Sequence, residues 1–368
     1  MYYTIFYTNG QYAKIKKEVI SDMKSKQIVF TKVNTAELVD YEYGQPEAHQ
    51  VVVETVFSAI SCGTEKANVS GDNNVSIVKD ENTVIEFPRY PGYSSSGIVV
   101  AKGSGVTSVE VGDSVAMGES SVSEACHKKY NVIAENKVIK FDERKVSFQE
   151  AAFSYISTFP MAALRKTQLE IGESMLVMGL GILGLMAVQF AKAAGAVPVI
   201  AVDPVAERRE KALKFGADFA FDPFDADFVE KVKAVTNGGA KAAIEVTGLG
   251  AGLNQCLDCM AKFGRIALLG CTRDKNFTVD YYRKVHGPGI QLIGAHTAAR
   301  PRYESYPGYF TWQDDAKTML KLCEMGRINL RDMIDEAYSP EDCFQVYTRL
   351  INDRNFPAVS QFDWRNIK

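Results

Sequence analysis

The sequence lacks the features of a membrane-spanning, secreted or nucleic-acid-binding protein. No apolar run among its 368 residues approaches the length that crosses a bilayer, and residues 1–6 (MYYTIF) lack the charged-then-apolar order of a signal peptide. With 42 basic and 45 acidic residues, the net charge of -3 gives no reason to expect nucleic acid or an anionic membrane as a partner. We therefore expect a cytoplasmic protein that acts on a small molecule.

Cysteine is too sparse for a disulfide framework. The seven cysteines are odd in number and scattered, so reduced thiols are expected. Cys256 and Cys259 form a C-x-x-C pair within residues 252–263, a stretch whose apolar periodicity predicts a helix. We expect ordinary packing of both thiols, because metal or redox use needs partner ligands or a strand-to-helix turn beside the pair.

The chain is longer than one hydrophobic core usually holds, which predicts two domains. The first half reads as short strands and turns, typical of a small irregular barrel, with strands at 27–30, 50–56, 97–101, 113–117 and 137–141. From about residue 150, short apolar strands alternate with helical segments, which indicates a doubly wound parallel sheet with strands at 175–178, 197–202, 242–246, 265–269 and 290–294.

This change in the pattern of strands and helices predicts the domain boundaries. We predict one domain from residues 1–158 with 328–368 and a second from residues 159–327. A first strand that starts naturally near Met23 leaves residues 1–22 as an extra segment, either an added strand and helix or a mis-assigned start.

A glycine-rich loop follows the strand at 175–178 and precedes a predicted helix at 185–194. Its G-x-G-x-x-G spacing allows a tight turn, a close approach of a pyrophosphate, and close packing of the helix on the strand. The helix N-terminus adds unpaired N–H groups and the positive end of its dipole. The predicted phosphate-binding residues are therefore Gly179, Leu180, Gly181, Ile182, Leu183 and Gly184.

Asp203 ends the next strand, 19 residues after Gly184. A carboxylate there can accept hydrogen bonds from both ribose hydroxyls of NAD and repel the 2′-phosphate of NADP. Arg208 and Arg209 stand close behind and could instead bind that phosphate, and Asp203 could be a solvated strand-end carboxylate. We predict NAD in preference to NADP, with Thr247 lining the adenosine side.

Two further stretches, residues 91–100 (PGYSSSGIVV) and 103–115 (GSGVTSVEVGDSV), complete a specific combination. Together with the glycine loop, they make the chain resemble the medium-chain dehydrogenase/reductase superfamily of alcohol dehydrogenases from about residue 24 to the end. The resemblance implies an α/β protein with a GroES-like irregular β-barrel catalytic domain, a Rossmann domain, an active site in the cleft between them, and a homodimer or homotetramer.

The zinc ligands of that superfamily are largely missing. Its zinc-using members place a Cys after an early strand, a His-Glu pair after Pro-Gly, and a third Cys or Glu before the cofactor domain. By resemblance, this chain keeps Cys62, but it has Tyr93 and Ser94 at the second position and Tyr155 near the third. Catalytic zinc needs three protein ligands, so we predict no catalytic zinc. We predict no structural zinc either, because that metal needs four clustered cysteines and only Cys126 lies between residues 63 and 255.

Hydroxyl groups are the predicted replacement for the metal. Tyr93 and Tyr155 occupy vacated ligand positions and could donate to a developing alkoxide, or they could simply fill the space. By resemblance, Thr64 relays the substrate proton. The alternative is that its hydroxyl only hydrogen-bonds to the backbone of a local turn. Thr158 matches a threonine that contacts the nicotinamide. Cys62 is expected to be a packed thiol rather than a nucleophile.

Residues 294–312 have the most distinctive composition of any segment in the chain, with two arginines, three tyrosines, a tryptophan and a histidine. They predict a loop that covers the cleft and presents donors, His296 and Arg300 among them, to a hydroxyl-rich or anionic substrate. A subunit contact is the alternative.

Three functions remain open on the sequence. The first is an NAD-dependent dehydrogenase of a secondary alcohol of the sugar, polyol or cyclitol class. The second is a zinc-free enone or quinone reductase, and the third is an NAD-binding redox sensor without turnover.

Overall fold

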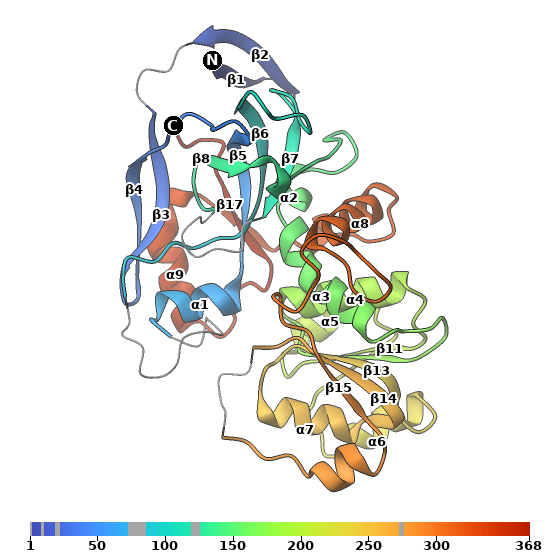
Figure 1. The fold of residues 1–368 in the computed structure, drawn as a ribbon. Coiled ribbons are helices and arrows are strands. Elements are labelled where there is room, and N and C mark those ends of the chain that lie inside the picture. The colour runs from blue at the N-terminus through green and yellow to red at the C-terminus, as the bar shows by residue number, and fades with distance from the viewer. Residues whose placement is uncertain (1, 9–10, 19–22, 73–85, 119–125, 272–275) are drawn as a thin grey trace. The chain divides into compact units, whose positions relative to one another are not determined.

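The computed structural model divides the chain into two compact units. Unit 1 is Met1–Ile156 with Leu330–Lys368, and unit 2 is Ser157–Asn329. The structure describes residues 2–8, 11–18, 23–72, 86–118, 126–271 and 276–368, with side chains from residue 23 onward (Figure 1). Within these residues, no helix is both long and apolar enough to cross a membrane.

Unit 1 is built on a mostly antiparallel sheet. Its strand order is β16-β17-β5-β6-β7-β9, β8 pairs with β5, and only β16 and β17 are parallel. The long β5 carries two register shifts against β6, which bend it as a barrel requires. The strands are β5 (Gln50–Ile60), β6 (Ser94–Lys102), β7 (Ser114–Gly118), β8 (Tyr130–Ala134), β9 (Val138–Lys140), β16 (Glu336–Tyr338) and β17 (Ser360–Asp363).

Two separate strand pairs and a few short helices complete unit 1. The antiparallel pairs are β1 (Tyr2–Thr8) with β2 (Gln11–Glu18), and β3 (Lys24–Lys32) with β4 (Thr35–Glu42). The first pair corrects one expectation for residues 1–22, because the segment forms two paired strands and not a strand and a helix. The helical elements are α1 (Cys62–Val69), α2 (Phe148–Ala151), α9 (Cys343–Asn352), η2 (Glu135–Lys137), η4 (Arg331–Met333) and η5 (Pro340–Asp342).

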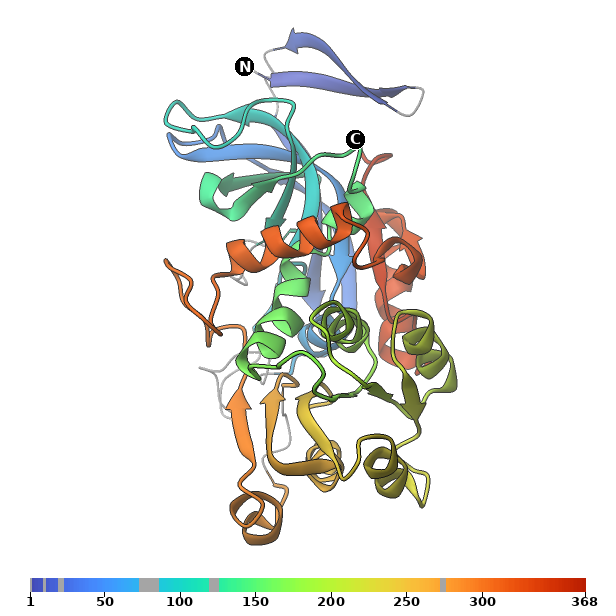
Figure 2. The same cartoon turned by 90° about the vertical axis from the view of Figure 1, so that its right-hand side faces the viewer.

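Unit 2 is a six-stranded parallel sheet in the order β12-β11-β10-β13-β14-β15. Helices α4 and α5 lie on one face and α6 and α7 on the other, and the arrows of β13, β14 and β15 point the same way (Figures 1 and 2). The strands are β10 (Met175–Met178), β11 (Val199–Val202), β12 (Phe219–Phe221), β13 (Ala240–Glu245), β14 (Met260–Leu268) and β15 (Gln291–Gly294).

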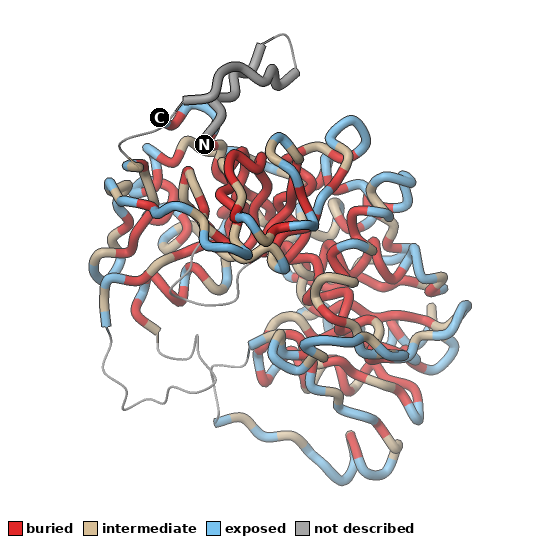
Figure 3. The backbone as a smooth tube through the Cα atoms, turned by 45° about the horizontal axis from the view of Figure 1, so that its top comes forward, coloured by how far each residue is buried: buried red, intermediate tan, exposed pale blue. Residues whose placement is uncertain are grey.

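The helices of unit 2 follow its strands in alternation, which is why the sheet is parallel. They are α3 (Ser154–Lys166, which contains the boundary between the units), α4 (Ile182–Ala193), α5 (Ala206–Lys214), α6 (Phe228–Val235), α7 (Gly250–Asp258), η3 (Tyr282–His286) and α8 (Trp312–Glu324). The central strands β10 and β11 are buried at every position because helices cover both faces. Figure 3 shows the buried residues of the described chain in red.

The predicted helix at 252–263 is wrong in its second half. Helix α7 ends at Asp258, and β14 begins at Met260, whose pairing with Ala240 of β13 starts the parallel ladder. Hydrogen bonds to a neighbouring strand outweigh the local helical periodicity here.

Cys256 and Cys259 are both buried, and burial raises the pKa of each thiol, as expected for packed rather than reactive cysteines.

Candidate active site

The glycine loop of unit 2 has the geometry that a bound pyrophosphate requires. Gly179 has a φ of +98°, and a Cβ on Gly184 would lie 1.9 Å from the Gly179 carbonyl oxygen. Gly181, the N-cap residue of α4, faces open space, with nothing within 4 Å of an added Cβ. The first and last glycines therefore close the turn tightly, and the middle one leaves room above the N–H groups of α4.

The side chains within the loop face inward. Leu180 and Ile182 are buried, and Leu183 is half-buried, so they anchor the turn through packing. They offer no polar side-chain atoms, so the loop can hydrogen-bond a ligand only through its backbone.

Asp203 ties this loop to the end of β11. Its side chain is 4% exposed and accepts hydrogen bonds from the Leu180 N–H at 2.8 Å and the Val205 N–H at 2.9 Å. The Arg208 guanidinium lies 3.8 Å from the same carboxylate. Arg209 instead donates to the Asp203 carbonyl oxygen and pairs with Asp222 at 3.1 Å. Asp203 is thus a fixed carboxylate at the glycine loop rather than a solvated one.

Thr247 follows β13 and packs against the same loop. A Cβ on Gly179 would lie 2.9 Å from the Thr247 methyl group. The Thr247 hydroxyl and N–H both donate to buried Glu245, which also accepts from the Gly248 N–H at 3.1 Å. Burial is the main cause that raises the pKa of Glu245. The sequence analysis did not identify Glu245, although an acidic residue at the end of an apolar strand signalled it.

A cationic group gathers around the beginning of the predicted substrate loop. Arg300 donates to the Thr158 hydroxyl at 2.9 Å, and the buried Lys166 donates to the carbonyl oxygens of Gly294 and Ala299 at 2.8 and 2.6 Å. Lys166 was missed because nothing near it in the sequence signals the contact. The structure therefore brings the loop and Thr158 together within unit 2.

His296 lies in the same group. His296 is exposed, but its partial desolvation, followed by the cations Arg300 and Lys166, lowers its pKa. The Ala298 N–H points at His296 Nδ1 at 3.1 Å, so the neutral ring carries its proton on Nε2. A neutral histidine with one N–H to donate is the form present at neutral pH.

In unit 1, hydroxyl groups gather around Tyr93. Its phenol donates a short hydrogen bond to Ser61 Oγ, and the Tyr155 ring meets it edge-on with centroids 5.9 Å apart. Burial raises the pKa of Tyr93 and nearby Glu65 adds to the rise, whereas the Ser61 and Thr64 hydroxyls partly offset it. The phenol is therefore neutral and can donate a proton. Ser61 is the member that the sequence analysis did not identify.

Tyr155 is placed by α3 and β7. Its ring packs against Gly118, where an added Cβ would lie 2.2 Å from the ring. Thr158 stands one helical turn further along α3, so the two residues are neighbours on one side of that helix.

Ser61 is the N-cap of α1, and Cys62 and Thr64 lie in its first turn, where the Glu65 carboxylate reaches back to the Ser61 N–H at 2.9 Å. Cys62 Sγ lies 3.7 Å from the carbonyl oxygen of Pro357, consistent with a packed thiol.

Glu65, the carboxylate of this group, is buried and accepts hydrogen bonds from the Tyr347 hydroxyl and the Ser61 N–H. Among the residues that the structure describes, no three His, Cys, Asp or Glu side chains are grouped so that they could hold a metal ion.

Comparison with known proteins agrees with this layout. Residues 47–150 match the alcohol dehydrogenase GroES-like domain, and residues 183–312 match the family described as zinc-binding dehydrogenase. Sorbitol dehydrogenase of Bacillus subtilis is 31% identical over 300 residues, which cover 74% of this chain and 80% of the relative. The chain belongs to the medium-chain dehydrogenase/reductase superfamily. D-guloside 3-dehydrogenase of Escherichia coli K12 is 29% identical to this chain, and the match covers 87% of this chain and 95% of the relative.

Solved structures show the same fold. An Escherichia coli oxidoreductase of unknown specificity superposes with a TM-score of 0.80 at 17% identity, covering 93% of this chain and 99% of its own. Benzyl alcohol dehydrogenase of Acinetobacter calcoaceticus gives a TM-score of 0.77 at 20% identity, with coverage of 92% and 99%. The predicted fold class, a Rossmann sheet plus a GroES-like domain, is confirmed.

Proposed function

We propose that this protein is an NAD(H)-dependent oxidoreductase that interconverts a secondary alcohol of the sugar, polyol or cyclitol class and its ketone without catalytic zinc. The observation that carries the proposal is the fixed Asp203 carboxylate, hydrogen-bonded to the glycine loop at the Leu180 N–H. We further propose that the protein is cytoplasmic, that it forms a homodimer or homotetramer, and that its substrate is a small molecule.

The residues of unit 2 fit a dinucleotide. The open space at Gly181 and the N–H groups at the start of α4 suit a pyrophosphate, and Asp203 suits ribose hydroxyls. When bound, NAD supplies the nicotinamide that accepts or returns the hydride. Asp203 would repel the extra phosphate of NADP, which favours NAD.

The hydroxyl group of unit 1 would manage the proton. Tyr93, neutral because of its raised pKa, would donate a proton to the oxygen of a ketone, and the Ser61 and Thr64 hydroxyls would then stabilise the phenolate. In the reverse direction the Tyr93 phenolate, which burial disfavours and the Ser61 and Thr64 hydroxyls partly stabilise, would take the proton of the alcohol. Tyr155 would hold the Tyr93 ring by edge-on contact.

The substrate class rests on the relatives and on unit 2. The relatives are named for sorbitol, a guloside and, in L-threonine 3-dehydrogenase of Pyrococcus furiosus at 28% identity, threonine. In this chain, the His296 Nε2–H and the Arg300 guanidinium would donate hydrogen bonds to such a hydroxyl-rich molecule.

A substrate screen tests the proposal. Polyols and cyclitols are offered with NAD or NADP, and enones and quinones with NADH, and the absorbance of reduced nicotinamide is followed. We expect turnover of a polyol or cyclitol with NAD. Enone or quinone reduction alone would replace the proposal with the reductase, and NADH binding without any turnover would replace it with the redox sensor.

Two glycine variants control the screen. Gly184→Ala puts a Cβ against the Gly179 carbonyl oxygen and should abolish cofactor binding, whereas Gly44→Ala meets nothing within 4 Å and should leave it intact. Unchanged NADH affinity in Gly184→Ala would contradict the role given to the glycine loop.

A further inference from the structure

A buried polar chain in unit 1 lies directly behind the Tyr93 group and has no part in the chemistry proposed above. It runs from Trp364 through Ser58 and His127 to Glu65, where Tyr347 of α9 also ends. Glu65, His127 and Tyr347 are 1%, 0% and 1% exposed. A carboxylate buried this deeply is stable only when its oxygens accept several hydrogen bonds.

The hydrogen-bond donors of this buried polar chain all point toward Glu65. Trp364 Nε1–H can only donate, and it does so to Ser58 Oγ at 2.8 Å. Glu65 accepts from the Tyr347 hydroxyl at 2.6 Å, and His127 Nε2 faces it at 3.3 Å. With a proton on Nε2 facing the carboxylate, Nδ1 accepts the Ser58 hydroxyl at 2.7 Å. Every polar atom in the chain thus has a partner of the right kind.

One end of this chain fixes α1. Glu65 belongs to the first turn of that helix, and its other oxygen accepts from the Ser61 N–H at 2.9 Å. The Ser61 hydroxyl is the acceptor of the Tyr93 phenol, and Thr64 stands next to Glu65 on the same turn. Holding Glu65 therefore holds both hydroxyls that face Tyr93.

The other contact of His127 fixes Tyr93 itself. The imidazole packs on Gly92, where an added Cβ would lie 2.6 Å from His127 Cγ and where φ is +85°. The neighbouring Cys126 N–H donates to the Gly92 carbonyl oxygen at 3.2 Å. One side chain thus contacts both the residue before Tyr93 and the carboxylate that anchors Ser61.

We propose that His127 and Tyr347 are positioning residues that lock Tyr93 against the Ser61 and Thr64 hydroxyls through the Gly92 backbone and the Glu65 carboxylate. The catalytic consequence rests on the proposed function, whereas the locking itself does not. Neither residue touches the reacting atoms in this scheme, so each acts only through the geometry of others.

Hydrogen exchange tests the locking without any substrate. Tyr347→Phe removes one hydroxyl and keeps the ring, and we expect faster amide exchange in the peptides covering residues 61–65. His127→Gln, which offers a donor and an acceptor on one side chain but loses the ring packed on Gly92, should speed exchange at residues 91–94 as well. The matched control is Tyr41→Phe, which also deletes phenol hydrogen bonds in unit 1, one to the Tyr130 carbonyl oxygen and one from the Tyr130 N–H, and should change neither peptide.

Kinetics test the catalytic consequence on the full-length protein. We expect Tyr347→Phe to lower kcat by ~5- to ~50-fold, the range that small displacements of reacting groups produce, with unchanged affinity for NADH. His127→Leu should lose more kcat than His127→Gln, because only glutamine can donate to Glu65. Tyr41→Phe should keep the parent kcat.

The outcomes separate the two proposals. Unchanged exchange at residues 61–65 and 91–94 in Tyr347→Phe and both His127 variants would overturn the locking. Faster exchange with kcat within about twofold of the parent would overturn its catalytic role. If no substrate of the screen is turned over, the proposed function fails and the exchange result still decides the locking.

Discussion

Buried carboxylates in this protein bind backbone N–H groups at the points where its candidate site is assembled. Asp203 accepts from Leu180 and Val205, Glu245 from Thr247 and Gly248, and Glu65 from Ser61. Each carboxylate thereby fixes a turn that follows a strand. Hydrogen bonds to a charged acceptor are stronger than neutral ones, so single residues of this kind set local geometry.

Asp203 should determine the choice of cofactor. Replacing it with serine removes the charge that repels a 2′-phosphate and leaves Arg208 close by. We expect Asp203→Ser to narrow the preference for NAD over NADP at least ~10-fold, which corresponds to about 1.4 kcal/mol. The measurement is kcat/KM for both cofactors. Equal use of NAD and NADP by the unaltered protein would show that the arginines dominate.

The hydroxyl group around Tyr93 should carry the proton transfer. Tyr93→Phe or Thr64→Val should lower kcat by ~10²- to ~10⁴-fold, the usual contribution of a positioned acid or base, with NAD affinity nearly unchanged. Tyr93→Phe and Tyr155→Phe keep their rings, so a large loss could not be attributed to a cavity. If all three variants stay within about threefold of the parent, the donors lie elsewhere, and His296 and Arg300 are the next candidates.

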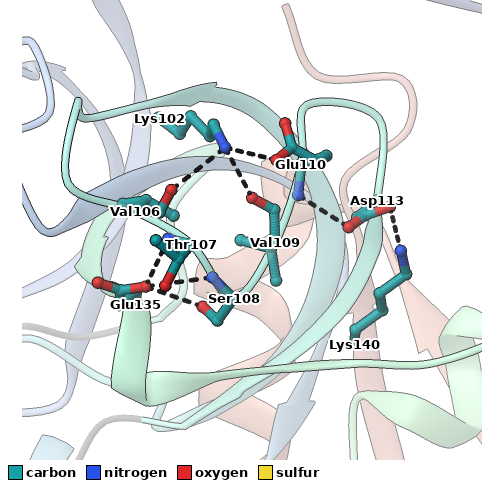
Figure 4. A network of polar contacts seen from close by, with 9 residues as sticks. All are labelled: Lys102, Val106, Thr107, Ser108, Val109, Glu110, Asp113, Glu135 and Lys140. Carbon is teal, nitrogen blue, oxygen red and sulfur yellow. Dashed lines mark hydrogen bonds and ion pairs between the residues drawn. The ribbon is translucent and has the colours of Figure 1, made fainter.

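At the scale of elements, the connection between β6 and β7 shows how an exposed loop is held in place. Glu135, in η2, accepts from the N–H groups of Thr107 and Ser108 at 3.1 and 3.4 Å and from the Ser108 hydroxyl at 3.0 Å. Lys102, at the end of β6, donates to the Val106 and Val109 carbonyl oxygens from the other side (Figure 4). Polar contacts shape this loop, whereas apolar packing shapes the strands.

Acid should loosen this loop through Glu135. The hydrogen bond from His49, followed by those from Thr107 and Ser108, lowers the pKa of Glu135 from 4.5 to about 2. A lowered pKa stabilises the fold fully above pH 4.5, and this contribution is lost as the pH falls toward about 2.

Glu135→Gln tests this dependence. The variant should flatten the acid dependence of the free energy of unfolding in that pH range and speed amide exchange at residues 107–108. Glu37→Gln, at an exposed position of β4, is the control and should keep the parent dependence. The same acid dependence in Glu135→Gln and the parent would contradict the assignment.

At the scale of the whole molecule, metal content is a direct prediction. Protein purified without added metal should contain well under one zinc per chain, and chelators should leave its activity unchanged, because only Cys62 of the three superfamily ligand positions holds a zinc-binding side chain. Stoichiometric zinc that disappears in Cys62→Ser would contradict the prediction that the protein binds no catalytic zinc.

Assembly is a second prediction at this scale. Strand β15 ends the six-stranded sheet and pairs only with β14 among the described strands, and its Leu292 is 40% exposed. Unpaired strand edges favour pairing with another chain. Sedimentation should therefore find a dimer or tetramer that Leu292→Lys weakens, whereas Leu213→Lys, at an exposed position of α5, should have no effect. A monomeric parent protein would contradict this.

The sequence by itself determined the fold class and the cofactor loop. Gly179, Gly181 and Gly184 and the strand and helix beside them are contiguous, so their spacing alone specifies the turn. Asp203 follows one strand later at a characteristic distance. Signals of this kind depend on local geometry, which adjacent residues encode directly.

Only the tertiary structure decided the contacts between distant segments. Ser61 meets Tyr93, Lys166 holds the loop at Gly294, and His127 meets Glu65 because strand pairing and helix packing bring together residues that lie tens of positions apart. The end of α7 has the same cause, since the pairing of Met260 with Ala240 overrides the helical pattern. A single sequence does not encode these partners locally, because each depends on the register of elements formed elsewhere in the chain.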